Sequence, residues 1–434
     1  MTGLTKMPSL TNRIEPLRAL TFNRDRAGDL SSLVAPPYDL IDSARQAELY
    51  ARHPFNVIRL ELNREVDPYS AAAATLREWV AEGVLAQRAR PAIYYYTQRF
   101  ELAGRQHVRH GIVARIRLEE FASGRILPHE RTFPKAKEDR LRLLTATRVN
   151  ISPIFGLYPA GDADLSRLLA KTASAPPTMH VVDDLGITNE VREIDTPADI
   201  ATIQHALAHV RVLIADGHHR YETALEYRRR MRIGDGDPAE TRPYDYVMMT
   251  LVAFDDPGLV ILPTHRLVRH LPPEAIAAFD SRAQPIFEIE QHRDPTAVVD
   301  AIAPGRKGAL GVLLKGGLAR ILRLKQPATM AAATPDAPAA VRDLDVSILH
   351  GLVLDRIFGI EADEVRKGGN LEYTIDAPRA MAEVVAGAAD GAFLMAPPTV
   401  DDVARVCGAG ETMPEKSTYF HPKLLTGLMM NPLD

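Results

Sequence analysis

The densest group of chemically active side chains lies in residues 212–227, which read VLIADGHHRYETALEY. An apolar run of strand length ends at Asp216-Gly217, a strong turn pair, and apolar residues then recur at helical spacing. The pattern predicts a strand, a tight turn and a helix. Its first helical turn carries three polar residues: His218, His219 and Arg220.

This arrangement suits an anion, because the first N–H groups of a helix lack partners and the helix dipole is positive there. Arg220 could clamp a phosphate, and a histidine could donate to a phosphoryl oxygen or carry a proton. Asp216 could hold a metal ion or orient an imidazole. The alternative is purely structural: Asp216 caps the helix, and Arg220 pairs with Glu222 or Glu226 on a solvated face.

A second cluster spans residues 127–150, LPHERTFPKAKEDRLRLLTATRVN. His129 and Glu130 lie in a proline-flanked loop, and a general base must be a carboxylate or imidazole held within reach of a hydroxyl group. Glu130 meets that description. The helix that follows carries basic residues such as Lys137 and Arg140, which would favour a polyphosphate. In the alternative, it is a solvated helix whose acidic residues partly cancel the basic ones.

Two further stretches carry weaker signals. VAPPYDLI (34–41) contains a Pro-Pro-Tyr-Asp turn, which could be an ordinary turn within a loop. KSTYFHPKLLTGLMMNP (416–432) is rich in polar donors and could fold back over a site or form a surface tail. Together with His129, we take Lys416, Ser417 and His421 from this stretch as candidate substrate contacts.

The composition restricts the class of protein. The chain has 434 residues, of which 46% are hydrophobic and 25% charged, so we expect two or three domains. The formal net charge of −4 gives no overall attraction to nucleic acid or an anionic membrane. Cys407 is the only cysteine, which excludes an intrachain disulfide and multi-cysteine metal sites. Without a signal peptide pattern or a long apolar run, the sequence predicts a cytoplasmic protein.

The order of elements predicts an α/β fold of the mixed α+β kind. Strands are expected at 56–62, 92–102, 107–121, 151–159, 244–254 and 391–398, and helices at 69–87, 135–147, 164–174, 197–209 and 344–358. Residues 308–324 read as a hairpin turning at Gly316-Gly317. We expect an N-terminal region (1–160), a central region (161–325), an Ala- and Pro-rich linker or loop (326–340) and a C-terminal region with a polar tail (341–434).

The common phosphate and nucleophile motifs are missing: there is no GxxxxGK[ST] loop, GxGxxG turn, GxSxG elbow or protein-kinase signature. The whole chain nevertheless resembles a bacterial and archaeal family, domain of unknown function 1015. The resemblance lies in these segments, in this order: VAPPYDLI, NVIRLEL, ILPHERTFPKAKEDRLRLL, NISPIFGLY, ADGHHRYETALEY, LPTHRLV and MPEKSTYFHPKLLTGLMMNPL.

A narrower resemblance concerns Asp216 to Arg220, which is similar to the Asp-Gly-(His/Asn)-His-Arg stretch of the ParB/sulfiredoxin-like fold. Members of that fold use this stretch to bind nucleotide phosphates. Sulfiredoxins need a cysteine here, and the CTP-hydrolysing partition proteins carry a basic DNA-binding domain; this sequence has neither. The free serine kinases, which have the Asp-Gly-His-His-Arg form and a glutamate as base, are most similar. The resemblance implies a ParB/sulfiredoxin-like nucleotide-binding core within a larger, multi-lobed chain.

The resemblance also implies roles for individual residues. Arg220, Gly217 and the backbone at His218 would bind the nucleotide phosphates, with Lys137 and Arg140 adding positive charge. His219 would stabilise the transferring phosphoryl group, and Asp216 would orient a histidine or Mg²⁺. Glu130 would accept the proton of the substrate hydroxyl.

The expected function is therefore a phosphotransferase that converts free L-serine, or another small hydroxylated metabolite, with ATP or ADP as donor and Mg²⁺ as a further cofactor. Two alternatives use the same phosphate site. A nucleotide-binding switch or scaffold would transfer nothing, and a phosphatase or nucleotide hydrolase would use water as the acceptor. We expect a small molecule and a nucleotide as partners, no nucleic acid and no membrane; the sequence leaves the oligomeric state open.

Overall fold

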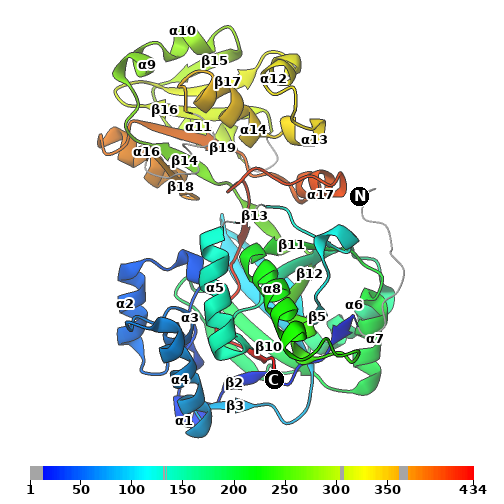
Figure 1. Ribbon diagram of the computed structural model, residues 1–434. Helices are drawn as coiled ribbons and strands as arrows, with labels where there is room; N and C mark the ends of the chain where they lie inside the picture. The colour runs from blue at the N-terminus through cyan, green and yellow to red at the C-terminus, as the bar shows by residue number, and fades with distance from the viewer. Residues whose placement is uncertain (1–12, 131, 133, 304–306, 361–369) are drawn as a thin grey trace. The chain divides into compact units, whose positions relative to one another are not determined.

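The computed structural model describes residues 13–130, 132, 134–303, 307–360 and 370–434. The chain forms two compact units (Figure 1). The large unit contains the described residues up to Val260 together with Pro422–Asp434, and the small unit contains Ile261–His421. The last stretch of the chain thus belongs to the same unit as its N-terminal part.

A nine-stranded mixed sheet forms the centre of the large unit. Its order is β6 (Ile126–Leu127), β11 (Val212–Asp216), β8 (Ile154–Tyr158), β12 (Tyr246–Ala253), β5 (Arg105–Arg117), β4 (Ile93–Leu102), β10 (Thr188–Ile194) and β9 (Met179–Val182), with β1 (Ile14–Glu15) also on β5. The pairs β11–β6 and β8–β12 are parallel and the others antiparallel. The expected mixed α/β class is confirmed.

Helices pack against this sheet and against one another. They are α1 (Arg24–Ala27), α2 (Ser43–Arg52), α3 (Ile58–Glu61), α4 (Pro68–Ala81), α5 (Pro134–Thr147), α6 (Ala163–Ala173), α7 (Pro197–Leu207) and α8 (His218–Gly234). Apolar residues of α6, α7 and α8 share one core with the sheet, including Leu165, Ile203 and Tyr221. Helices α5 and α8 lie side by side (Figure 1). The core therefore fixes the start of α8 relative to the end of β11.

The strand expected at residues 56–62 is wrong, because this segment forms the short helix α3. The Asn56 side chain accepts from the backbone N–H of Ile58 at 3.0 Å and donates to the Ser32 carbonyl at 2.7 Å. A short apolar run does not by itself distinguish strand from helix. One consequence is that Glu61, at the end of α3, is buried.

Residues 422–434, which we call the C-terminal strap, run through the large unit. Thr426 exchanges backbone hydrogen bonds with Ala35, and Met430 does so with Leu20. β21 (Asn431–Pro432) then pairs with β7 (Val149–Asn150). The strap is buried over most of its length. A further short pair of strands, β2 (Leu20–Phe22) and β3 (Leu85–Gln87), adjoins the strap, because Leu20 of β2 is the residue that pairs with Met430.

The small unit has a six-stranded antiparallel sheet of its own. The order is β15 (Phe287–His292), β17 (Ala319–Leu324), β16 (Ala309–Leu314), β19 (Gly391–Met395), β14 (His265–Val268) and β18 (Leu371–Thr374). The hairpin predicted at Gly316-Gly317 is confirmed. At the unit boundaries, β13 (Val260–Leu262) pairs with β20 (Tyr419–His421).

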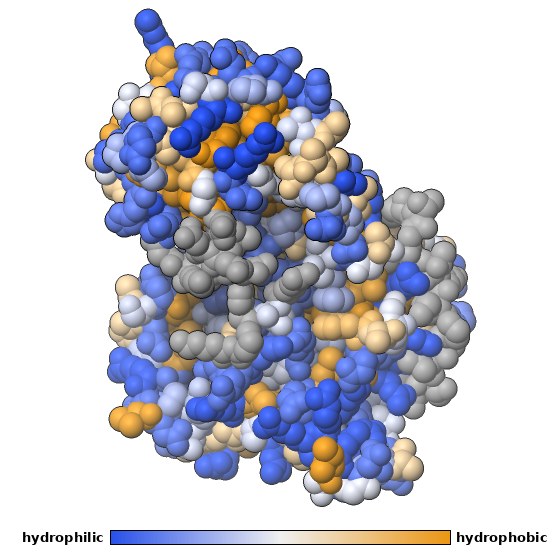
Figure 2. Space-filling view, turned by 45° about the horizontal axis from the view of Figure 1, so that its top comes forward, coloured by the Kyte–Doolittle hydropathy of each residue, from blue (hydrophilic) through white to orange (hydrophobic). Residues whose placement is uncertain are grey.

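The described helices of the small unit are α9 (Pro273–Ala277), α10 (Phe279–Ala283), α11 (Thr296–Ala301), α12 (Pro327–Ala333), α13 (Ala339–Arg342), α14 (Asp345–Ile348), α16 (Ala377–Val385) and α17 (Val400–Gly408). Most of the Ala- and Pro-rich stretch at 326–340 is thus occupied by α12 and the start of α13. The face drawn in Figure 2 is mainly hydrophilic, with hydrophobic side chains in small groups. Among the described residues, no helix is both long and apolar enough to cross a lipid bilayer.

Candidate functional site

The motif Asp216 to Arg220 lies at the junction of β11 and α8, as its sequence pattern predicts. β11 ends at Asp216, and α8 begins at His218. Gly217 makes the turn with φ 90° and ψ 29°, a left-handed conformation that glycine adopts without strain. A Cβ at this position would lie 3.0 Å from the Arg220 guanidinium. Gly217 is the N-cap of α8 and, as a glycine, contributes no side-chain cap to its first turn.

Asp216 is held between two cations. Its Oδ1 accepts a hydrogen bond from Lys423 Nζ at 2.7 Å, and its Oδ2 accepts one from Arg220 Nη2 at 2.8 Å. Burial opposes ionisation of this carboxyl group, but Lys423 and Arg220 outweigh it and hold the pKa of Asp216 well below its usual range. Asp216 is therefore a carboxylate that orients two cations, and it does not cap α8.

Arg220 is anchored by the sheet and not by the acidic residues of its own helix. Its Nη1 donates to the Pro153 carbonyl at 2.6 Å. Glu222 instead accepts from Lys137 Nζ at 2.7 Å and from Thr132 Oγ1 at 2.8 Å. Arg220 Nε is buried, and no acceptor for it exists among the residues that the structure describes. The solvated pairing of Arg220 with Glu222 or Glu226 is thereby excluded.

Two histidine rings, His218 at the start of α8 and His129 in the loop before α5, contact each other. The backbone N–H of His129 donates to His218 Nε2 at 3.1 Å, and His129 Nδ1 donates to the Ile214 carbonyl at 2.5 Å. Both side chains are buried. Burial lowers the pKa of His129 and, together with His129, lowers that of His218 well below its usual value. Both imidazoles are therefore neutral at pH 7, and the proton of His218 is on Nδ1.

The same contact fixes the loop that carries Glu130. Because His129 is tied to both β11 and α8, its neighbour Glu130 lies in a loop that adjoins the start of α8. Glu130 is half-buried, and its charge partly offsets the effect of burial on the pKa of His129. His219, also half-buried, follows His218 in the first turn. The structure thus brings the 129–130 loop and the 216–220 motif together.

The basic residues predicted on α5 form ion pairs. Lys137 binds Glu222, as described above, whereas Arg140 Nη1 binds Glu61 Oε1 at 2.9 Å and Arg140 Nη2 binds Asp139 at 2.6 Å. The Arg140 guanidinium also stacks 4.3 Å above the centre of the Tyr38 ring. Burial raises the pKa of Glu61, against the attraction of Arg140, and it raises that of Tyr38 to about 12. Through its contact with Arg140, Tyr38 of the VAPPYDLI segment lies close enough to Arg220 to feel its charge.

The polar stretch near the C-terminus is divided between the units. Lys416, Ser417 and His421 belong to the small unit, where Ser417 is buried. Lys423 belongs to the large unit and is the residue of this stretch that binds Asp216.

Sequence reasoning missed the residues that hold the strap in place. Arg109, fully buried on β5, donates through Nη2 to Gln98 Oε1 and to the Pro422 carbonyl. Gln98 on β4 donates to the Lys423 carbonyl at 3.1 Å and to Asn189 Oδ1 at 3.0 Å. The backbone on either side of the Lys423 Cα is thus tied to the sheet. The available signal was Gln98, which lies on the same strand face as Tyr94, Tyr96 and Phe100. The strand of Arg109 carries several other polar residues and gave no such signal.

The described residues do not form a protein site for Mg²⁺. Asp216 was the expected ligand, but both of its oxygens are bound to cationic side chains. No group of three or more His, Cys, Asp or Glu side chains that could hold a metal ion occurs in the described parts of the chain. The expected role of Asp216 as a magnesium ligand therefore receives no support.

Comparisons with known proteins place the chain in a family. It belongs to the family described as proteins of unknown function, DUF1015, whose model matches residues 14–347. The family resemblance inferred from the sequence is thus confirmed. A search of the curated proteins gives no match.

Solved structures give similar chains at low identity. A conserved hypothetical protein from Pyrococcus furiosus is 14% identical, with 72% of this chain and 92% of that chain covered and a TM-score of 0.34. A free serine kinase variant in complex with ADP is 14% identical, with 72% and 88% covered and a TM-score of 0.36. C-terminally truncated SbnI from Staphylococcus aureus is 11% identical, with 74% and 87% covered and a TM-score of 0.34. With TM-scores this low, the likeness says nothing about ligand or chemistry in this chain.

Proposed function

We propose that this protein is a phosphotransferase that moves the terminal phosphoryl group of ATP or ADP to the hydroxyl group of a small metabolite, free L-serine in the first place. One observation carries the proposal. Asp216 fixes two cations, Lys423 and Arg220, at the start of α8, and the loop containing Glu130 is tied to the same turn. In this proposal, the large unit contains a ParB/sulfiredoxin-like nucleotide-binding core.

The phosphate groups bind where positive charge is concentrated. The backbone N–H groups at the start of α8 and the ammonium group of Lys423 favour an anion there. Gly217 allows close approach because it has no side chain, and Arg220 is kept in a fixed orientation by Asp216 and the Pro153 carbonyl. His218 supports this turn as a buried neutral ring, and His219 stabilises the charge on the transferring phosphoryl group. Such preorganised charge is the main requirement for phosphoryl transfer.

Glu130 supplies the base. Its carboxylate accepts the proton of the serine hydroxyl, while the serine oxygen forms a bond to the terminal phosphorus of the nucleotide. The bond between that phosphorus and the bridging oxygen breaks, so that ATP leaves as ADP, or ADP as AMP. A binding switch would need the cations at the start of α8 but no carboxylate base, so the location of the Glu130 loop supports the enzyme.

The test is to incubate the purified protein with ATP, ADP or polyphosphate and a pool of amino and hydroxy acids, with and without Mg²⁺, and to analyse the products by mass spectrometry. Transfer yields an acceptor about 80 Da heavier, the mass that one phosphoryl group adds. Free phosphate without a phosphorylated acceptor would identify a hydrolase. Nucleotide binding without any product would identify a switch or scaffold.

A further inference from the structure

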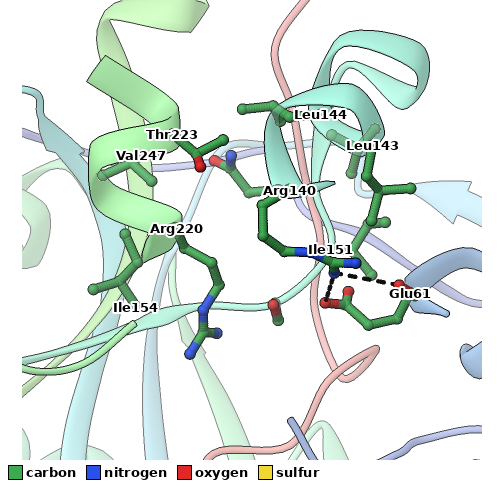
Figure 3. A pocket seen from close by; sticks show the side chains of 12 residues that line it. Glu61, Arg140, Leu143, Leu144, Ile151, Ile154, Arg220, Thr223 and Val247 are labelled. Carbon is green, nitrogen blue, oxygen red and sulfur yellow. Dashed lines mark hydrogen bonds and ion pairs between the residues drawn. The ribbon is translucent and has the colours of Figure 1, made fainter. Parts of the chain in front are cut away.

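A cavity of about 50 Å³ lies between α5 and α8 in the large unit (Figure 3). At one wall, Arg140 reaches from α5 to Glu61, and Arg220 extends from α8. Most of the remaining lining is aliphatic: Leu143, Leu144, Val149, Ile151, Ile154 and Val247. Since one water needs about 10–15 Å³ on this measure, a cavity of about 50 Å³ has room for roughly four non-hydrogen atoms.

Arg220 connects this cavity to the anion site. Its two terminal nitrogens bind Asp216 and the Pro153 carbonyl, and its Nε is buried without an acceptor among the described residues. A buried donor that lacks an acceptor is unfavourable. A ligand atom in the cavity with a free lone pair would satisfy it.

The charges around Arg220 favour an anionic ligand. Asp216 is shared by Arg220 and Lys423, so two positive charges meet one carboxylate. Glu61, the carboxylate at the cavity wall, pairs with Arg140, which also binds the half-exposed Asp139. A negatively charged ligand atom near Arg220 Nε would therefore balance the second positive charge of the group formed by Asp216, Arg220 and Lys423.

Size and polarity together narrow the chemical class. A nucleotide is far too large for the cavity. Inorganic phosphate carries oxygens on every side, and those that face the aliphatic part of the lining would have no donors. A carboxylate at the end of a carbon chain fits both the charged wall and the aliphatic lining of the cavity. The carboxylate oxygens face Arg220, and the carbon atoms of the chain contact the aliphatic side chains.

We propose that this cavity binds the carboxylate end of the phosphoryl acceptor, with Arg220 Nε as a donor to it, so that the acceptor is a short hydroxy or amino acid. This inference rests on the proposed function for the role of the ligand as acceptor. Arg220 would then contact both substrates, the nucleotide through its charge and the acceptor through Nε.

The first test compares three acceptors that differ by one group. L-Serine and 3-hydroxypropionate carry the carboxylate, whereas ethanolamine is serine without it. We expect both acids to be phosphorylated and ethanolamine to have a kcat/KM at least about a hundredfold lower than serine, because the site would leave buried polar groups unpaired. Equal use of ethanolamine and serine would overturn the inference.

The second test fills the cavity. Leu143→Phe should raise the KM for L-serine at least about tenfold, since the added atoms occupy the space of the ligand, and should leave the Kd for ATP unchanged. Leu141→Phe makes the same change on the same helix at a residue outside this lining and is the control. If Leu143→Phe does not fold, Val247→Ile adds a single carbon atom and should raise this KM by a smaller factor. A KM equal to that of the unmodified protein in a folded variant would overturn the inference.

Failure of the proposed function is distinguishable from failure of this inference. If no acceptor is phosphorylated, the phosphotransferase proposal fails, and the cavity is then tested by calorimetric titration with 3-hydroxypropionate alone. Saturable binding that Leu143→Phe abolishes would support a carboxylate site, and absence of binding to the unmodified protein would refute it.

Discussion

Lys423 Nζ lies 2.7 Å from Asp216 Oδ1, although 207 residues separate the two in sequence. Arg220, the other partner of Asp216, comes from the next turn of the same segment. The carboxylate therefore joins a local cation to one delivered by the C-terminal strap.

We predict that Lys423→Met weakens ATP binding at least about tenfold, because a charge-assisted contact is typically worth about 1.5–3 kcal/mol. Calorimetry measures the Kd. Lys171→Met, at an exposed position of α6, serves as the control and should bind as the unmodified protein does. Equal affinity in the two variants would remove Lys423 from the phosphate site.

Gly217→Ala should lower both stability and nucleotide affinity. The left-handed backbone costs a residue with a Cβ about 1 kcal/mol, and the new atom would displace the Arg220 guanidinium. Gly28 also has a positive φ, but nothing lies within 4 Å of a Cβ built there. Gly28→Ala should therefore lose stability in urea unfolding and keep its affinity for ATP. Matching binding defects in both variants would contradict the role given to the Arg220 contact.

Glu130→Gln should preserve nucleotide affinity and reduce phosphoryl transfer at least about a hundredfold, the scale of a lost general base. Single-turnover transfer and calorimetry, measured on the same preparation, separate the two effects. Glu138→Gln, at an exposed position of α5, is the matched control. Full transfer activity in Glu130→Gln would mean that another group takes the proton.

Stability should decrease as the pH falls below about 6.5, the ordinary pKa of histidine. The folded protein keeps His129 and His218 neutral, because burial lowers both pKa values, while the unfolded chain binds protons at this pH. Each histidine then lowers the free energy of unfolding by up to about 1.4 kcal/mol per unit of pKa difference. The loss continues until the pH reaches the folded-state pKa.

Urea unfolding at pH 7.5 and pH 5.5 measures this decrease. His218→Gln retains an acceptor for the His129 N–H and does not titrate, so the decrease should be smaller in this variant. An undiminished decrease would show that other groups cause it.

Arg109→Met should loosen the C-terminal strap. The Pro422 carbonyl and the Gln98 amide would lose a buried donor, at a cost of about 1–3 kcal/mol per unsatisfied group. Amide hydrogen exchange at 423–426 should accelerate relative to Arg105→Met, which changes an exposed arginine on the same strand. Similar exchange in both variants would show that the strap is secured by its other contacts.

Local features of the site could be predicted from the sequence. The end of β11, the turn at Gly217 and the start of α8 follow from an apolar run, a turn pair and helical spacing within one short segment. The neighbouring strands β4 and β5 and the charged helix α5 follow in the same way. In each case the residues that decide the structure are neighbours in the chain.

Lys423 and Glu61 illustrate what the sequence did not reveal. Lys423 is one polar residue among several near the C-terminus, and only the path of the strap selects it. Glu61 alternates with apolar residues in NVIRLEL, a pattern that indicates a strand with polar side chains facing solvent. The Asn56 contacts turn this segment into a helix and bury Glu61 next to Arg140.

The path of the strap also has a consequence for biosynthesis. The large unit is interrupted in the sequence by the small unit, and its sheet contacts are completed only by residues from Pro422 onward. A ribosome must therefore translate the whole small unit before the nascent chain contains Lys423, the second cation that binds Asp216. Until then, Arg109 and Gln98 lack the Pro422 and Lys423 carbonyls that they bind in the folded protein, and donors left unsatisfied in this way favour recognition of a prematurely terminated chain by cellular quality control.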